Sequence, residues 1–202
     1  MTDAIKIYGS SDSGNCLKVK WVAELLGRPY EWIETSSFDG STRTPGFLAL
    51  NPAGQVPLVI FADGRKLAQS NAIMLYLAEG TDLVASDAFA RAKMMEWLFW
   101  EQYSHEPAIA VRLARLHFLK MREQDLDPAL LTKGQAALAR MNSHLTESQY
   151  FGGARFNLAD IALYAYTRKA HLGGFALGDY PAVMTWLSRL KHDLQSGGAL
   201  AA

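Results

Sequence analysis

Cysteine is nearly absent from this 202-residue chain, which contains only Cys16. A single cysteine excludes an intrachain disulfide and any zinc site built from several thiolates. The five histidines, at positions 105, 117, 144, 171 and 192, lack the short, regular spacing of metal ligands. We therefore expect no disulfide and no metal centre.

The chain also lacks an excess of charge, a long apolar run and a secretory leader. Its 20 Lys and Arg residues balance 20 Asp and Glu residues without a basic block, so no nucleic-acid partner is expected. No apolar run approaches the ~18 residues of a membrane span, so no membrane partner is expected either. Since residues 1–5 carry neither a basic region nor an apolar core, we predict a soluble, cytoplasmic protein.

Apolar residues are plentiful: 50% of the chain is hydrophobic, which is enough for one large domain or two small ones and excludes disorder. The character of the sequence changes near residue 80. Short strand-like runs alternate with helical ones in residues 1–80, and residues 87–202 have helical patterning throughout. Residues 81–86 have the composition of a linker, so we predict two domains.

The N-terminal domain begins with a predicted strand, helix and strand, at residues 5–8, 16–26 and 30–33. This order implies two parallel strands joined by a right-handed crossover. A short helical turn follows at residues 47–50. The strands of a hairpin come next, at residues 56–61 and 66–68, and then a helix that is capped by Ser70 and begins there. The order fits a thioredoxin-like α/β domain, with helices covering a four-stranded mixed sheet.

The all-α C-terminal domain has four predicted helices, at residues 87–117, 130–145, 157–172 and 182–194. Pro107 should kink the first of them. At the start of the third, Asn157 is a predicted N-cap and Asp160 follows three residues later, between apolar flanks. This is a capping box with a hydrophobic staple, and we assign it a role in folding only.

A first candidate binding motif is Asn51-Pro52-Ala53-Gly54-Gln55-Val56-Pro57, which precedes a strand. A Val56–Pro57 bond is one of the few places where a cis peptide costs only ~0.5–1 kcal/mol. A cis bend would turn the N–H and C=O of Val56 outward, where an extended peptide-like ligand can pair with them. The alternative is an ordinary proline at a sheet edge.

A second candidate motif, Gln69-Ser70-Asn71-Ala72-Ile73, opens a predicted helix. The N-terminal end of a helix carries unpaired N–H groups and the positive end of the helix dipole. The hydroxyl and N–H of Ser70 can therefore hold a carboxylate. Taken alone, Ser70 is equally explained as a helix cap.

Together with the capping box, these motifs resemble, in order and spacing, those of the soluble glutathione S-transferase family, in its bacterial-like, serine-type form. The resemblance covers essentially the whole chain. It implies a thioredoxin-like domain that binds glutathione, a helical domain that supplies the pocket for a second, electrophilic substrate, and a homodimer. Glutathione is then a co-substrate, and no cofactor is implied.

The implied reaction requires a glutathione thiolate, whereas a free thiol has a pKa of ~8.5. Lowering that pKa by about two units stabilises the thiolate by ~2.7 kcal/mol. One charge-assisted hydrogen bond supplies ~1.5–3 kcal/mol of this and a helix N-terminus up to ~1. By resemblance, Ser13, which directly precedes the first predicted helix, is the catalytic donor.

Other side chains near the start of that helix remain open as alternatives. Ser11 is the next choice for the donor, and Asn15 can contact glutathione or its sulfur. Cys16 lies on the apolar face of the helix, where a cysteine acts as a small hydrophobe, and a redox role is the less favoured reading. Tyr8 lies inside a strand, and we expect it to pack.

The resemblance also implies which residues contact the other parts of glutathione. Gln69 and Ser70 match the γ-glutamyl site, although many members carry Glu at the position of Gln69. Val56, followed by Pro57, would contact the cysteinyl backbone. Arg43 and Gln55 are the candidates for the glycyl carboxylate, and Arg43 is equally explained as a solvated loop charge.

For the electrophile, the resemblance points to the first long C-terminal helix, with Trp100, Tyr103 and Pro107 as pocket residues. His105 and Glu106 are given no catalytic role, and surface or interface ion pairing is their expected use. The predicted function is conjugation of glutathione to small hydrophobic electrophiles. A glutathione-dependent disulfide reductase or peroxidase, or a non-catalytic binding protein, is the alternative.

Overall fold

The computed structural model describes residues 4–199, which divide into two compact units. The first unit runs to Thr81 and includes the residues from Asp193 onward, and the second runs from Asp82 to His192. The last turns of the C-terminal helix thus group with the first unit rather than with residues 87–192. The two units are described separately.

The first unit is built on a four-stranded mixed sheet, as the sequence predicts. Its strands are β1 (Ile5–Gly9), β2 (Tyr30–Glu34), β3 (Leu58–Ile60) and β4 (Lys66–Ala68). They lie in the order β2-β1-β3-β4, with β1 parallel to β2 and antiparallel to β3. Register pairs Gly9 with Glu34, so the loop after β1 begins beside the end of β2.

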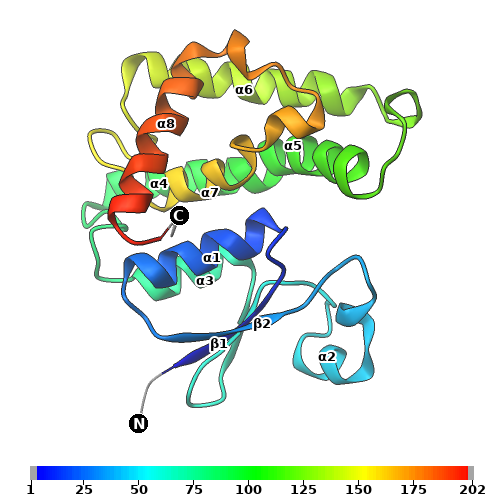
Figure 1. The fold of residues 1–202 in the computed structure, drawn as a ribbon. Coiled ribbons are helices and arrows are strands. Elements are labelled where there is room, and N and C mark those ends of the chain that lie inside the picture. The colour runs from blue at the N-terminus through cyan, green and yellow to red at the C-terminus, as the bar shows by residue number, and fades with distance from the viewer. Residues whose placement is uncertain (1–3, 200–202) are drawn as a thin grey trace. The chain divides into compact units, whose positions relative to one another are not determined.

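Three helices accompany the sheet: α1 (Gly14–Leu25), α2 (Pro45–Leu50) and α3 (Ser70–Ala78). Helices α1 and α3 lie side by side over one face of the sheet, and α2 lies away from them (Figure 1). Gly27 follows α1 with a φ of 60°, a left-handed conformation that ends helices and that glycine adopts easily. The strand predicted for residues 56–61 is shorter, since a proline at position 57 cannot donate to the ladder.

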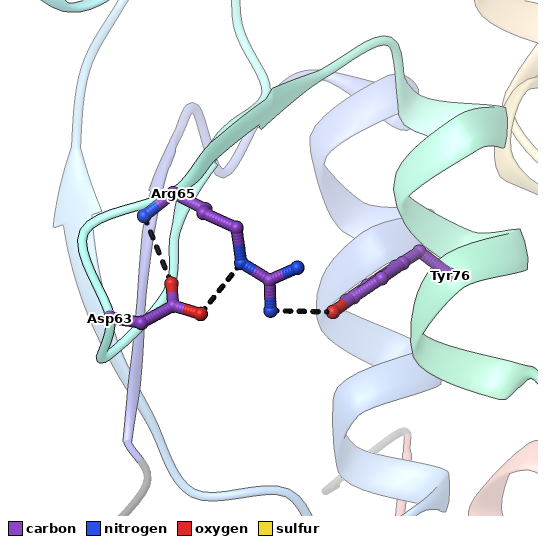
Figure 2. A network of polar contacts seen from close by, with 3 residues as sticks. All are labelled: Asp63, Arg65 and Tyr76. Carbon is purple, nitrogen blue, oxygen red and sulfur yellow. Dashed lines mark hydrogen bonds and ion pairs between the residues drawn. The ribbon is translucent and has the colours of Figure 1, made fainter.

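The β3–β4 hairpin is tied to α3 by a polar network at the surface (Figure 2). Asp63 accepts hydrogen bonds from the backbone N–H of Arg65, at 3.0 Å, and from its Nε, at 2.6 Å. The guanidinium of Arg65 also donates to the hydroxyl of Tyr76 at 3.1 Å. These side chains are exposed, so the network fixes the turn's orientation more than it adds stability.

The second unit is helical. Its α-helices are α4 (Ala88–Trp100), α5 (Glu106–Leu113), α6 (Ala129–Glu147), α7 (Leu158–Thr167) and the greater part of α8 (Pro181–Ser196). The long helix predicted over 87–117 is present from Ala88 to Phe118, but it contains π-helical turns at Glu101–His105 and Ala114–Phe118 that the sequence did not indicate. Pro107 lies just after the first of these turns. Because proline has no backbone N–H, one helical hydrogen bond is missing at this point.

Helix α7 forms the centre of this unit, and all but one of its residues are buried. The predicted capping box is confirmed, with Asn157 as N-cap and Asp160 accepting from its N–H at 3.0 Å. Asp160 is fully buried and also accepts from the N–H groups of Phe151 and Gly152 and from the indole of Trp186. The box therefore joins three segments of chain. The helix ends at Thr167, earlier than the predicted Leu172, and a separate 3₁₀ turn follows.

None of the helices within residues 4–199 combines the length and the apolar character that crossing a bilayer requires.

Candidate active site

The loop between β1 and α1 is held by a carboxylate from the next strand. Glu34 Oε1 accepts from the backbone N–H of Ser11 at 2.9 Å, and its Oε2 accepts from the Trp32 indole at 2.8 Å. Slight burial raises the pKa of Glu34, but the hydrogen bonds from Trp32, Ser11 and Ser10 together lower it by more. The net shift of the pKa is therefore downward. Ser11 thus anchors the loop, and its hydroxyl lies 3.4 Å from the same oxygen.

Ser13 is the residue that directly precedes α1. It has an extended backbone, and its side chain makes no capping hydrogen bond to the helix. Its own N–H donates to the carbonyl of Ser10 at 3.1 Å, which fixes the turn. The hydroxyl is therefore half-exposed at the positive end of a 12-residue helix, without a backbone group to satisfy.

Cys16 lies one turn into α1 and is completely buried. Burial raises the pKa of its thiol, and the opposing hydrogen bonds from Ser13 and Ser10 are smaller effects. The Cβ of Cys16 is also close to the chain at Gly9, where a side chain would meet both it and the Trp32 ring, at 3.0 and 2.7 Å. The packing agrees with the apolar role expected of Cys16.

Asn15 and Ser70, which are 55 positions apart in the chain, are brought together. The hydroxyl of Ser70 donates to Asn15 Oδ1 at 3.1 Å. Asn15 is the second residue of α1 and Ser70 the first of α3, so this bond joins the N-terminal ends of two helices. Ser70 is not the N-cap that the sequence predicts, because its hydroxyl is directed at Asn15 and Gln69 occupies the cap position.

Gln69 has an unusual backbone. Its φ is 70° and its ψ is 109°, a combination that a residue with a Cβ rarely adopts. Within residues 4–199, Lys120 is the other non-glycine residue with a positive φ. Such strain is retained where the surrounding structure holds it, often at ligand sites. Here it places an exposed amide directly before α3.

The segment before β3 presents free backbone groups. Of the two readings left open for Pro57, the cis one is found: the Val56–Pro57 bond is cis. Asn51 shapes the preceding turn: its Nδ2 donates to the carbonyl of Gln55 at 2.7 Å and its Oδ1 accepts from the N–H of Ala53 at 3.2 Å. Across the described part of the chain, no hydrogen bond occupies the N–H or C=O of Val56.

Arg43 lies against the same turn. One of its guanidinium nitrogens is 3.5 Å from the carbonyl of Ala53. Gly54, with a φ of 59°, leaves room for it, since a Cβ there would lie 2.5 Å from that nitrogen. Arg43 is exposed and carries no ion pair in the described chain, so its charge is available close to Gln55 and Val56.

The three predicted electrophile residues line one cavity of about 680 Å³ within the second unit. Its walls come from the segment around the first π-helical turn and from α6. The lining residues are Trp100, Tyr103, Ser104, Pro107, Ala108, Leu130, Lys133, Ala136, Ala137 and Arg140. Tyr103 extends into solvent at its rim, with 87% of its surface exposed.

The expectation of surface or interface pairing is wrong for His105, which is completely buried. Its Nε2 lies 2.8 Å from the hydroxyl of Thr167, and that hydroxyl donates to the carbonyl of Leu163. This hydrogen bond joins His105 to Thr167. His105 connects the π-helical turn to α7 and does not line the cavity.

Sequence reasoning missed three contributors. Glu34 was detectable in principle, because it ends a strand that is parallel to β1 and therefore lies beside the loop after β1. Lys133 and Arg140 were not, since nothing in the sequence of α6 shows that these turns face Trp100. Within residues 4–199, no three His, Cys, Asp or Glu side chains are grouped to hold a metal.

Family models match both parts of the chain. One described as "Glutathione S-transferase, N-terminal domain" matches residues 12–79, and one described as "Glutathione S-transferase, C-terminal domain" matches residues 109–189. The chain belongs to the glutathione S-transferase family. The matched residues include Ser13, the turn before β3 and Ser70 in the first unit, and α6 in the second.

Individual relatives agree with this assignment. A glutathione S-transferase from Pseudomonas fluorescens Pf-5 has 41% identity and a TM-score of 0.88, over 92% of this chain and 93% of that one. A theta class glutathione S-transferase from Xanthomonas axonopodis pv. citri, solved with glutathione bound, has 28% identity and a TM-score of 0.85, over 99% of both chains. The Escherichia coli disulfide-bond oxidoreductase YfcG is 30% identical, over 91% of this chain and 88% of that one.

Proposed function

We propose that this glutathione S-transferase is of the serine type and joins the sulfur of glutathione to small hydrophobic electrophiles. The observation that carries the proposal is the meeting of the α1 and α3 N-termini at the Asn15–Ser70 hydrogen bond. Two helix dipoles then favour negative charge in one region, where a thiolate and a carboxylate can both be bound. The glutathione-bound relative from Xanthomonas supports the choice of ligand.

In this proposal Ser13 donates its hydroxyl hydrogen to the glutathione sulfur. The hydroxyl has no capping duty, and it lies at the start of α1, so both the hydrogen bond and the dipole stabilise the thiolate. The thiol proton passes to solvent. The thiolate then attacks the electrophilic carbon: an S–C bond forms, and the bond to the leaving group breaks with its electron pair.

In the same proposal, the remaining parts of glutathione contact residues of the first unit described above. Ser70 and the N–H groups of α3 hold the γ-glutamyl carboxylate, and the amide of Gln69 contacts the same end. The N–H and C=O of Val56 pair with the cysteinyl backbone, as an added strand would. Arg43 and Gln55 receive the glycyl carboxylate. Gln69 cannot pair with the ligand's ammonium as a glutamate can, which weakens binding by the loss of one charged contact.

The test has two readouts. Titration calorimetry with glutathione measures binding, and release of chloride from 1-chloro-2,4-dinitrobenzene measures transfer. Millimolar glutathione should bind and should be consumed in a saturable reaction. Binding without turnover of any aryl halide or benzyl halide would instead identify a carrier, and absence of both binding and turnover would overturn the proposal.

The similarity to YfcG supports a second candidate, reduction of disulfides by glutathione. One glutathione thiolate would attack the disulfide to give a mixed disulfide and a released thiol. A second glutathione would then release the other thiol and form oxidised glutathione. Cys16 is too deeply buried to take part. Consumption of 2-hydroxyethyl disulfide faster than that of 1-chloro-2,4-dinitrobenzene would favour this activity.

We also infer a homodimer, no cofactor besides the co-substrate glutathione, and a cytoplasmic location. Support for the dimer comes from α4, where Phe89 and Phe99 expose 75% and 69% of their surfaces. Exposed phenylalanines on one helix are typical of a face that another chain covers.

A further inference from the structure

A carboxylate at the end of β2 holds the loop that carries Ser13. Glu34 is the last residue of β2, and it pairs in register with Gly9, the last residue of β1. The loop after β1 therefore starts beside Glu34. The Oε1 of Glu34 accepts from the N–H of Ser11 at 2.9 Å, and Ser13 follows two residues later. The place of this carboxylate thus bears on the place of the proposed thiolate donor.

Glu34 is itself oriented by Trp32. The two side chains are on the same face of β2, because residues two apart in a strand point the same way, and the indole Nε1 donates to Glu34 Oε2 at 2.8 Å. Packing fixes the indole in turn. A Cβ at Gly9 would lie 2.7 Å from its ring, and the Nζ of Lys20 lies 5.7 Å from the ring centre. Contacts therefore run from the sheet through Trp32 and Glu34 to the loop.

Only a carboxylate can serve both of these donors at once. The N–H of Ser11 uses one oxygen of Glu34, and the indole N–H of Trp32 uses the other. An amide has one accepting oxygen and an NH₂ group that only donates, so a glutamine would leave one N–H facing an NH₂ group. Hydrogen bonds to an ionised oxygen are also the stronger ones. Slight burial raises the pKa of Glu34 and these bonds lower it by more, so the ionised form holds the loop.

The charge of Glu34 acts against the thiolate that this loop is proposed to stabilise, because a negative charge raises the pKa of a nearby thiol. The structure shows this effect at Cys16, three residues after Ser13. Burial is the main cause of the raised pKa of the Cys16 thiol, and the charge of Glu34 adds to it. Glu34 therefore has two opposite effects at this place: its hydrogen bonds fix the loop, and its charge disfavours a second anion.

We propose that Glu34 is a positioning residue of the transfer reaction: by accepting from Ser11 and Trp32 together, it sets the loop so that a hydroxyl meets the glutathione sulfur. That hydroxyl belongs to Ser13. The inference rests on the proposed transferase function and adds to it a residue that touches neither substrate. The positioning effect exceeds the unfavourable effect of the charge, so Glu34 lowers the pKa of the bound thiol overall.

The experiment measures the thiol pKa of glutathione bound to the wild type and to Glu34→Gln, from the ultraviolet absorbance of the thiolate against pH. Glu34→Gln should raise this pKa by ~0.5–1 unit, because the loop loses one of its two contacts. Below that pKa, kcat for 1-chloro-2,4-dinitrobenzene should fall about three- to tenfold, in proportion to the thiolate fraction. The KM for glutathione should change little. A lower thiol pKa in Glu34→Gln would show that the charge is the larger effect and would overturn the proposal.

Two further variants make the result specific. In the double variant Trp32→Phe/Glu34→Gln, the amide oxygen can accept from Ser11 while its NH₂ group no longer faces an indole N–H. The thiol pKa of this variant should therefore lie closer to that of the wild type than the Glu34→Gln value does. A thiol pKa at or above the Glu34→Gln value would show that the two donors do not share the carboxylate. Glu31→Gln removes another exposed carboxylate of β2, one that lies 3.6 Å from the Nζ of Lys6, and should leave the thiol pKa and kcat unchanged.

Melting temperatures separate positioning from support of the fold. A Glu34→Gln variant with a lower melting temperature but with the thiol pKa and kcat of the wild type would assign Glu34 to stability alone and overturn the proposal. In that case the wild type still conjugates glutathione, and the transferase function stands. If the wild type itself neither binds glutathione as a thiolate nor conjugates it, the transferase proposal fails, and the positioning role of Glu34 fails with it.

Discussion

At the scale of single residues, the most consequential side chain is Ser13. Its position was accessible from sequence, because a polar residue directly before the first amphipathic helix is placed by local pattern alone. Its freedom from capping was not accessible, since a serine at that position usually bonds to its own helix. The hydroxyl also hydrogen-bonds to the Cys16 thiol, so a ligand at this position would have to share or replace that contact.

Replacing Ser13 with alanine should lower kcat for 1-chloro-2,4-dinitrobenzene by roughly 10- to 100-fold, because a hydrogen bond to a charged group contributes ~1.5–3 kcal/mol. The affinity for glutathione should change little, since the other contacts hold the tripeptide. The pKa of the bound thiol, read from its ultraviolet absorbance against pH, should rise toward that of free glutathione. Ser11→Ala is the matched control, and a larger loss there than in Ser13→Ala would reverse the assignment.

Asp160 is a residue whose protonation should affect stability. Burial raises its pKa from 3.8 to about 6, against four N–H donors that favour the ionised form. A raised pKa means that the folded state holds the proton more tightly than the unfolded state. The contribution of protonated Asp160 to the free energy of unfolding is therefore fully present below about pH 4, and it is lost as the pH rises through about 6.

Urea denaturation of the wild type and of Asp160→Asn at about pH 4 and about pH 7 tests this. The difference in unfolding free energy between the two proteins should fall by up to ~3 kcal/mol as the pH rises, at ~1.4 kcal/mol for each pKa unit. Asp179→Asn, at an exposed position, should show no such trend. A difference that grows with pH would mean that the four donors outweigh burial.

At the scale of elements, sequence patterns predicted most strands and helices because amphipathic periodicity and turn chemistry are local. The order of β1, α1 and β2, the hairpin and the capping box all follow from such signals. The two π-helical turns did not, since no local pattern distinguishes a π-helical turn from an α-helical one, and only the first lies beside a sequence signal, Pro107. The pairing of Asn15 with Ser70 is likewise a tertiary contact without a local signal.

Gly134 shows how packing overrides helix propensity within α6. An alanine is ordinarily ~1 kcal/mol better than a glycine inside a helix. Here a Cβ would overlap the ring of Phe175, which is almost completely buried. Gly134→Ala should therefore lower the unfolding free energy by ~1–3 kcal/mol, as an overpacked core does.

The same substitution at Gly46 is the comparison, because it lies in α2 with open space where a Cβ would be. Gly46→Ala should leave the unfolding free energy unchanged or raise it by up to ~1 kcal/mol. Equal effects of the two variants in thermal or urea denaturation would contradict this prediction. They would show that the Phe175 ring can move aside without lowering the free energy of unfolding.

At the scale of the whole molecule, the homodimer is the property that α4 bears on most directly. Static light scattering should give a mass twice the 22.3 kDa of one chain. Phe99→Glu should reduce it to that of a single chain at micromolar concentration, because a charge would replace an apolar contact. Met184→Glu, at an exposed position on α8, should not, and a wild type with the mass of one chain would remove the dimer from the proposal.

The hydrogen bond between Ser70 and Asn15 has a consequence for how tightly glutathione can be held. The serine hydroxyl that is proposed to receive the carboxylate is already engaged before any ligand arrives, so binding exchanges one partner for another. The enthalpy gained at this point is the difference between two contacts rather than the whole of one. The complex is therefore weaker than a count of its polar contacts suggests, and release of the conjugated product is correspondingly easier.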